Sequence, residues 1–295
     1  MFGGAECVLA AALAFLPSDA RNAHSLVSDF TRKCPVRDAG SRGAHSAAGY
    51  IASHLKTLGA APVLDRFAAP TPIGVRTFVN VSAEWRFEAS GDAPWIVLTS
   101  HYDTKCGCPG ANDGASTSAL LLAFASALNR SESPGFNIQL LWLDGEECMK
   151  AYLPGDGFWG SKRAAEKLKA SGRRVKAVIC LDMLGDADLN ISIPRNVTPS
   201  LSRVALAAAA QLEKRGFKNK VSTIRELVKD DHQAFLEQGF PAIDLIDFDY
   251  GGKKGENRYW HTTEDTPDKV SAESILYSAR LVVEMIEQLA VSPKS

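Results

Sequence analysis

The chain alternates between short, nearly continuous apolar runs and longer segments of helical periodicity. Apolar runs of strand length are typical of strands that are buried on both faces of a sheet. They lie at residues 95–100, 138–143, 175–181 and 242–246, and a further extended segment lies at 76–85. Helical spacing predicts helices at residues 44–58, 115–128, 161–170, 201–215, 233–238 and 272–289. This alternation predicts an α/β fold with a central mixed, largely parallel sheet flanked by helices on both faces.

The apolar run at residues 8–16 allows two interpretations. It resembles the hydrophobic part of a signal peptide, and Pro17 follows it directly. No lysine or arginine precedes Arg21, however, and Glu6 stands where a signal peptide carries positive charge. We therefore expect a first, partly buried helix here. No apolar run approaches the roughly 18–20 residues that a membrane-spanning helix needs.

Composition narrows the class of protein. The 295 residues are 45% hydrophobic, and we expect them to form a single domain over residues 1–295 and a monomer. The formal net charge is −1, which gives no reason to expect nucleic acid or an anionic membrane as a partner. The six cysteines match no zinc-finger spacing, and whether Cys7 and Cys34 pair is left open.

Acidic and histidine residues follow the ends of the predicted buried strands. In open α/β sheets, ligands bind beyond the carboxyl ends of the strands, so these side chains are expected to meet in one cleft. A turn of small residues at 110–116 allows Asp113 to project into the same cleft. The residues at or after strand ends are His101, Asp103, Glu146, Glu147, Asp182 and His261, and Asp230, Asp231 and His232 precede the helix at 233–238.

Several carboxylates in one cleft repel each other and lose hydration, so they shift their pKa values or bind a cation. A set of aspartate, glutamate and histidine side chains suits zinc. Glu146 and Glu147 are adjacent and cannot both point the same way from a strand end. One of them can bind a metal while the other acts as an acid or base.

These motifs resemble the zinc aminopeptidase superfamily and, within it, the animal-type glutaminyl cyclases. The similarity extends over almost all of the chain from about Arg37. The superfamily motifs are His101-Tyr102-Asp103, Asn112-Asp113-Gly114, Asp144-Gly145-Glu146-Glu147, Leu181-Asp182 and Trp260-His261-Thr262. Three features favour the cyclase branch, namely Asp230, Trp260 and the segment at residues 158–163.

The resemblance implies a function and a role for each residue. It implies one zinc ion, held by Asp113, Glu147 and His261, and Glu146 as general acid and base. Asp182 and Asp230 would form an acidic hydrogen-bond network with Glu146, and Trp260 and Tyr152 would line the substrate pocket. The implied reaction converts the N-terminal glutamine of a peptide or protein to pyroglutamate and releases ammonia. The resemblance to secreted cyclases also favours an extracytoplasmic location.

The alternative is a zinc aminopeptidase with two metal ions. In that case His101 and Asp182 would hold the second ion, Asp113 would bridge the two, and Asp103 would stand beside them. The chain departs from the animal cyclases at several positions. Tyr152 stands where they have tryptophan, serines occupy the positions of their disulfide, and Asn112-Asp113-Gly114 is closer to the aminopeptidases. These departures bear on substrate recognition more than on the metal site.

Overall fold

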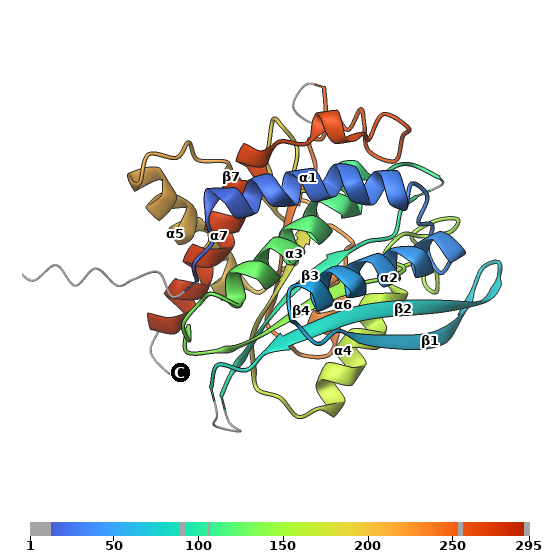
Figure 1. The fold of residues 1–295 in the computed structure, drawn as a ribbon, viewed down its shortest axis with the longest axis horizontal. Coiled ribbons are helices and arrows are strands. Elements are labelled where there is room, and N and C mark those ends of the chain that lie inside the picture. Colours follow the sequence, from blue (N-terminus) through green and yellow to red (C-terminus); the bar gives the residue numbers. More distant parts are fainter. Residues whose placement is uncertain (1–12, 89–92, 106, 253–255, 292–295) are drawn as a thin grey trace, which may run out of the picture.

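An eight-stranded sheet runs through the centre of the computed structural model (Figure 1). The structure describes residues 13–88, 93–105, 107–252 and 256–291. The strand order of the sheet is β1-β2-β4-β3-β5-β8-β6-β7. The strands are β1 (Val63–Thr71), β2 (Gly74–Trp85), β3 (Trp95–His101), β4 (Asn137–Leu143), β5 (Val175–Asp182), β6 (Ile191–Ile193), β7 (Val221–Thr223) and β8 (Ala242–Asp247).

The four central strands β4, β3, β5 and β8 are parallel to one another. On one side β2 is antiparallel to β4 and β1 is antiparallel to β2, and on the other side β6 is antiparallel to β8 and parallel to β7. The carboxyl ends of the four central strands therefore meet at one edge of the sheet. The predicted mixed, largely parallel sheet is confirmed.

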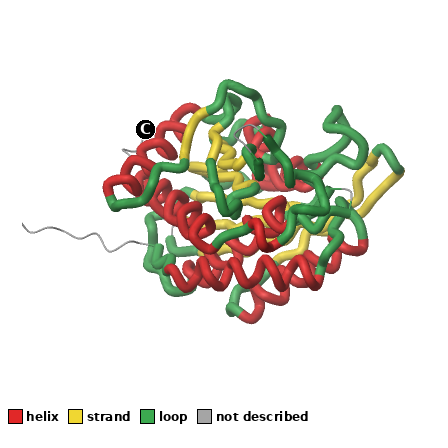
Figure 2. The backbone as a smooth tube through the Cα atoms, turned by 90° about the horizontal axis from the view of Figure 1, so that it is seen from above, coloured by secondary structure: helices red, strands yellow, loops and turns green. Residues whose placement is uncertain are grey.

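Helices cover both faces of the sheet (Figure 2). They are α1 (Pro17–Lys33), α2 (Arg42–Thr57), α3 (Thr117–Leu128), α4 (Trp159–Ala170), α5 (Pro199–Lys214), α6 (His232–Glu237) and α7 (Ala272–Val291). The larger hydrophobic core joins α1, α2, α3, α5 and α7 to one face, and a smaller core joins α4 and α6 to the other. Among the described residues, no helix has the length and apolar content needed to cross a bilayer.

The prediction of a helix at residues 8–16 is wrong for residues 13–16, the part of it that the structure describes. Residues 1–12, and with them Cys7, lie outside the described residues, but residues 13–16 are not helical and α1 begins at Pro17. Two local features set this start. Proline suits the first helical turn, and the Asp19 side chain accepts a hydrogen bond of 2.7 Å from the backbone N–H of Leu16.

The remaining predicted elements agree with the structure to within a few residues. The sequence did not predict α1 over its observed range, nor β1, β6 or β7. Strand β1 is edge-lying and alternates between exposed and half-buried positions, so it lacks a continuous apolar run. Strands β6 and β7 have only three residues each, which is too short for a period to be recognised.

Candidate metal centre and active site

Asp113, Glu147 and His261 direct one ligand atom each toward a common point, with these atoms within 4.8 Å of one another. His261 Nε2 lies 2.9 Å from Glu147 Oε1 and 3.4 Å from Asp113 Oδ2. Zinc–ligand bonds in tetrahedral geometry place neighbouring ligand atoms roughly 3.3–3.5 Å apart. Glu147 Oε1 is buried and makes no hydrogen bond within the described residues. These three side chains fit a metal ion.

A second group shares Asp113 with the first. His101 Nε2 lies 3.1 Å from Asp113 Oδ1 and 3.0 Å from Asp182 Oδ1. Asp113 thus turns one oxygen toward His101 and the other toward His261. The contact between His101 Nε2 and Asp182 Oδ1 has hydrogen-bond geometry. His101 Nε2 and Asp182 Oδ1 can therefore form a hydrogen bond with each other when no metal ion is bound.

Asp113 owes its position to a kink in the backbone. It lies in η1, a π-helical turn at Ala111–Ser116, where its own ψ is 91° and the φ of Gly114 is 92°. The carboxylate of Asp265 accepts hydrogen bonds from the backbone N–H groups of Asn112 (2.7 Å) and Asp113 (3.1 Å). A Cβ atom on Gly114 would lie 3.0 Å from His101 Cε1. Glycine is therefore needed at this position.

Asp103 fixes the two glutamates through their backbone. Its carboxylate oxygens accept hydrogen bonds from the N–H groups of Glu146 (3.2 Å) and Glu147 (3.1 Å). It lies outside both groups of possible metal ligands, and its nearer oxygen is 3.6 Å from His101 Nδ1. The sequence left its role open between metal binding and support, and the geometry corresponds to support.

Glu146 lies beside the first group rather than in it. The Tyr152 hydroxyl donates to Glu147 Oε2 at 2.7 Å and approaches Glu146 Oε2 at 3.3 Å, so it links the two carboxylates. Burial and the neighbouring charge of Glu147 raise the pKa of Glu146 well above its usual range. A buried carboxyl group with a raised pKa is suited to accept and release a proton.

Buried acids extend from Asp182 away from the metal ligands. Burial raises the pKa of Asp182 to about 7, although His101 opposes the shift. Asp230 is buried, and its Oδ2 atom makes no hydrogen bond within the described residues. Behind it, burial and the charge of Asp230 raise the pKa of Asp244 well above its usual range. Asp244 was not predicted, although an acid inside the otherwise apolar run of β8 was a signal of a polar interior.

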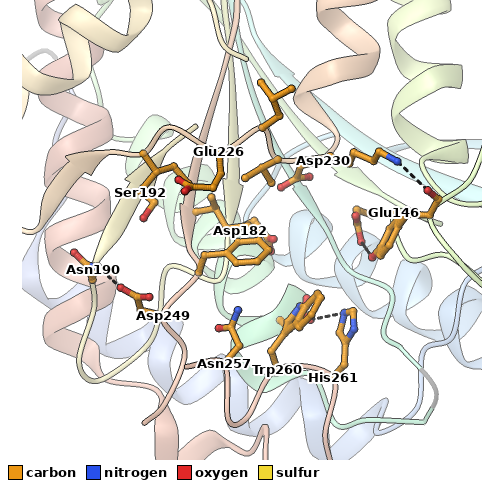
Figure 3. A pocket seen from close by; sticks show the side chains of 18 of the residues that line it. Glu146, Asp182, Asn190, Ser192, Glu226, Asp230, Asp249, Asn257, Trp260 and His261 are labelled. Carbon is orange, nitrogen blue, oxygen red and sulfur yellow. Dashed lines mark hydrogen bonds and ion pairs between the residues drawn. The ribbon is translucent and has the colours of Figure 1, made fainter. Parts of the chain in front are cut away.

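These side chains open on a cavity of about 870 Å³ (Figure 3). Glu146, Glu147, Asp113, Asp182 and Asp230 line its inner part, and Tyr152, Trp260 and His261 line it as well. The rings of Trp260 and His261 stack with centroids 3.9 Å apart, and His261 has a φ of 57°. A non-glycine residue in this left-handed region is uncommon and is often found at a functional site. Eight of the predicted site residues therefore line one cavity, whereas His101 and Asp103 do not line it.

Two supporting residues were not recognised in the sequence. One is Asp265, which holds the backbone at Asn112 and Asp113. The other is Arg37, which is fully buried and donates to the backbone oxygens of Tyr102 (2.7 Å) and Gly110 (3.0 Å). It thereby ties the loop after β3 to the start of η1. The backbone groups near the site that these two residues hold lie at least 65 positions away in the chain, so no local pattern could reveal them.

Comparisons with known proteins identify the family of the chain. The model of peptidase family M28 matches residues 80–286. The glutaminyl-peptide cyclotransferase-like protein of Bos taurus is 30% identical over 277 residues, which cover 82% of this chain and 70% of the bovine protein. The crystal structure of an Acidobacteriales bacterium glutaminyl cyclase is 32% identical, with a TM-score of 0.82 over 92% of this chain and 94% of that one.

A zinc-dependent exopeptidase from Parabacteroides distasonis shares the fold, with a TM-score of 0.76 over 91% of this chain and 97% of that chain at 22% identity. The fold alone therefore does not separate the cyclases from the exopeptidases, whereas identities of 30% and 32% over most of the chain tie it to the cyclases. The chain belongs to peptidase family M28 and, within that family, to the group that contains the glutaminyl-peptide cyclotransferases.

Proposed function

We propose that this protein is a zinc-dependent glutaminyl-peptide cyclotransferase, which converts the N-terminal glutamine of peptides to pyroglutamate and releases ammonia. The observation that carries the proposal is the arrangement around Glu146. A three-ligand group lies beside this buried carboxyl group at the cavity, and in the second group His101 hydrogen-bonds Asp182. The names of the relatives support the same activity.

Asp113, Glu147 and His261 would hold the zinc ion. When bound, zinc supplies a Lewis acid that polarises the γ-carbonyl group of the substrate glutamine. Asp103 and Asp265 keep the ligands in place through backbone hydrogen bonds. Partners of this kind that orient metal ligands contribute substantially to metal affinity.

Glu146 moves the proton. It takes a proton from the α-amino group as that nitrogen attacks the γ-carbonyl carbon, and the five-membered ring closes. It then returns the proton to the amide nitrogen as the bond between this nitrogen and the γ-carbon breaks, so ammonia leaves and Glu146 is restored. The raised pKa of Glu146 suits both steps. Because amine and carbonyl belong to one residue, the enzyme's further task is to hold them in the reactive geometry.

Four residues support this step. Asp182 and Asp230 line the inner cavity and would accept hydrogen bonds from the substrate amine or the departing ammonia. Tyr152 links the two glutamates with its hydroxyl and keeps Glu146 directed at the cavity. Trp260, stacked on His261, provides an apolar wall against which the closing ring can pack.

A zinc aminopeptidase is the second candidate, because Asp113 presents an oxygen to both ligand groups as a residue that bridges two metal ions would. Two measurements separate the candidates. Ammonia release from a peptide that begins with glutamine is assayed in parallel with hydrolysis of leucine anilide, and zinc per chain is determined. The cyclotransferase should release ammonia and hold about one zinc ion. Anilide hydrolysis without ammonia release, with about two zinc ions, would show the aminopeptidase instead.

A further inference from the structure

The cavity is much larger than its proposed reaction requires. Pockets of roughly 300–1,000 Å³ enclose ligands of drug size, and this cavity, at about 870 Å³, lies near the upper end of that range. A single glutamine residue fills only a small part of it. The remaining space lies against residues that take no part in the chemistry described above.

These remaining residues form an outer wall on the side of the cavity away from Glu146 (Figure 3). The wall comes from β6, the segment after β7 and the loop after β8. Its charged members are Glu226, whose side chain is exposed, and Asp249, whose Oδ2 accepts a hydrogen bond of 2.6 Å from the side-chain amide of Asn190. The uncharged members include Asn190, Ser192 and Asn257.

On the side of Glu146, Lys229 Nζ donates a hydrogen bond of 3.0 Å to the backbone oxygen of Tyr152, and both residues line the cavity. The larger part of the remaining lining belongs to the outer wall, so a peptide whose first residue is held at Glu146 has room to continue there. Its next residues advance by about 3.3–3.6 Å each when extended, which carries them toward the outer wall.

The charge of the lining is strongly one-sided. In the described part of the chain, seven carboxyl side chains line the cavity, and its only lysine or arginine is Lys229. A bound divalent cation and shared protons neutralise part of the inner group, but Glu226 and Asp249 stand outside that group. A cleft lined by one sign of charge attracts ligands of the opposite sign.

We propose that this outer wall is a binding subsite for the second and third residues of the substrate, and that Glu226 and Asp249 make it select a basic side chain there. The inference rests on the proposed cyclotransferase activity and names its substrate class, namely N-terminal glutamine followed by lysine or arginine. Selection acts on binding of the peptide chain, not on the proton transfer at Glu146.

The test compares four amidated peptides with the zinc-loaded enzyme. All begin with glutamine; one continues with alanines only, two carry lysine at the second or third position, and one carries glutamate at the second. We expect kcat/KM for ammonia release to be about 3- to 10-fold higher with lysine than with glutamate, as for one or two solvent-screened charge pairs. The difference should shrink in about 0.5 M salt, where such interactions are screened.

Glu226→Gln and Asp249→Asn should each lower the ratio of kcat/KM between the lysine and glutamate peptides. Glu237→Gln is the matched control, because Glu237 is also exposed but lines a neighbouring groove and not this cavity. It should leave the ratio unchanged. Equal kcat/KM for all four peptides, or an equal loss of ratio in the control, would overturn the subsite while leaving the activity in place. No ammonia from any peptide would overturn the proposed function itself, and the subsite with it.

Discussion

Asp265 offers a quantitative test of how the fold holds the metal ligand Asp113. Its carboxylate accepts three hydrogen bonds: from the N–H groups of Asn112 (2.7 Å) and Asp113 (3.1 Å) and from the Tyr250 hydroxyl (2.6 Å). In Asp265→Asn, the amide oxygen can keep the bonds to Asn112 and Tyr250. The amide NH2 group then faces the N–H of Asp113, so one bond to a charged acceptor is lost and one buried donor is left without a partner.

Each such bond contributes about 1.5–3 kcal/mol, and an unsatisfied buried donor costs about 1–3 kcal/mol. Because the two effects overlap, we expect Asp265→Asn to lower the free energy of unfolding of the zinc-loaded protein by about 2–4 kcal/mol. We also expect zinc affinity to fall about 10- to 100-fold, since the backbone of a ligand is no longer held. Urea unfolding and competition with a chelator measure the two quantities.

Asp247→Asn is the matched control. Asp247 is also buried and accepts two backbone hydrogen bonds, from Asn190 (2.8 Å) and Asp249 (3.1 Å), but it supports no metal ligand. It should lose stability to a similar extent and keep its zinc affinity. If both variants lose zinc equally, the loss reflects general destabilisation. If Asp265→Asn binds zinc as tightly as the wild type, the assigned role of Asp265 is wrong.

Three further predictions follow from the site. Glu146→Gln should lower kcat for ammonia release by about 10²- to 10⁴-fold, because it removes the group that moves the proton, yet leave bound zinc near one per chain; loss of zinc would mean that the two glutamates have exchanged roles. Gly114→Ala should lower the free energy of unfolding by at least about 1 kcal/mol and weaken zinc binding, because the φ of Gly114 is 92° and the new Cβ atom would lie 3.0 Å from His101. An unchanged melting temperature and an unchanged zinc titration would contradict this prediction. Burial raises the pKa of Asp182 to about 7 and that of Asp265 to about 6, both above their values in the unfolded chain. The folded state therefore holds more protons, and the free energy of unfolding of the metal-free protein should fall as the pH rises from about 5 to 8, while zinc should raise the melting temperature more at pH 8 than at pH 5. Thermal melts that show a rising stability over this range would contradict the prediction.

Most of the fold was predictable because its centre is apolar. Strands β3, β4, β5 and β8 are buried on both faces, so each has a nearly continuous hydrophobic run. Helix α1 was missed: a helix was expected at residues 8–16, and the helical spacing of Ala20, Ala23, Val27 and Phe30 after Pro17 was not recognised. Pairing at the sheet edges depends on tertiary contacts rather than on local pattern.

The part of the candidate site that lies at the carboxyl ends of the strands could be predicted from the sequence. His101, Glu146, Glu147 and Asp182 lie at or just beyond the carboxyl ends of central strands, so their positions could be inferred from the sequence. The number of bound metal ions could not be inferred from the sequence, because both candidate functions use the same ligand residues. The hydrogen bond between His101 and Asp182 is a geometric fact that only the structure supplies.

The proposed activity is the cyclisation of N-terminal glutamine at this site. The most direct test is mass spectrometry of a glutamine-initiated peptide after incubation with the zinc-loaded protein, with the Glu146→Gln variant alongside. We expect the wild type, and not the variant, to form a product that has lost one ammonia and keeps every residue. A peptide shortened by its first residue, or one left unchanged by the wild type, would contradict it.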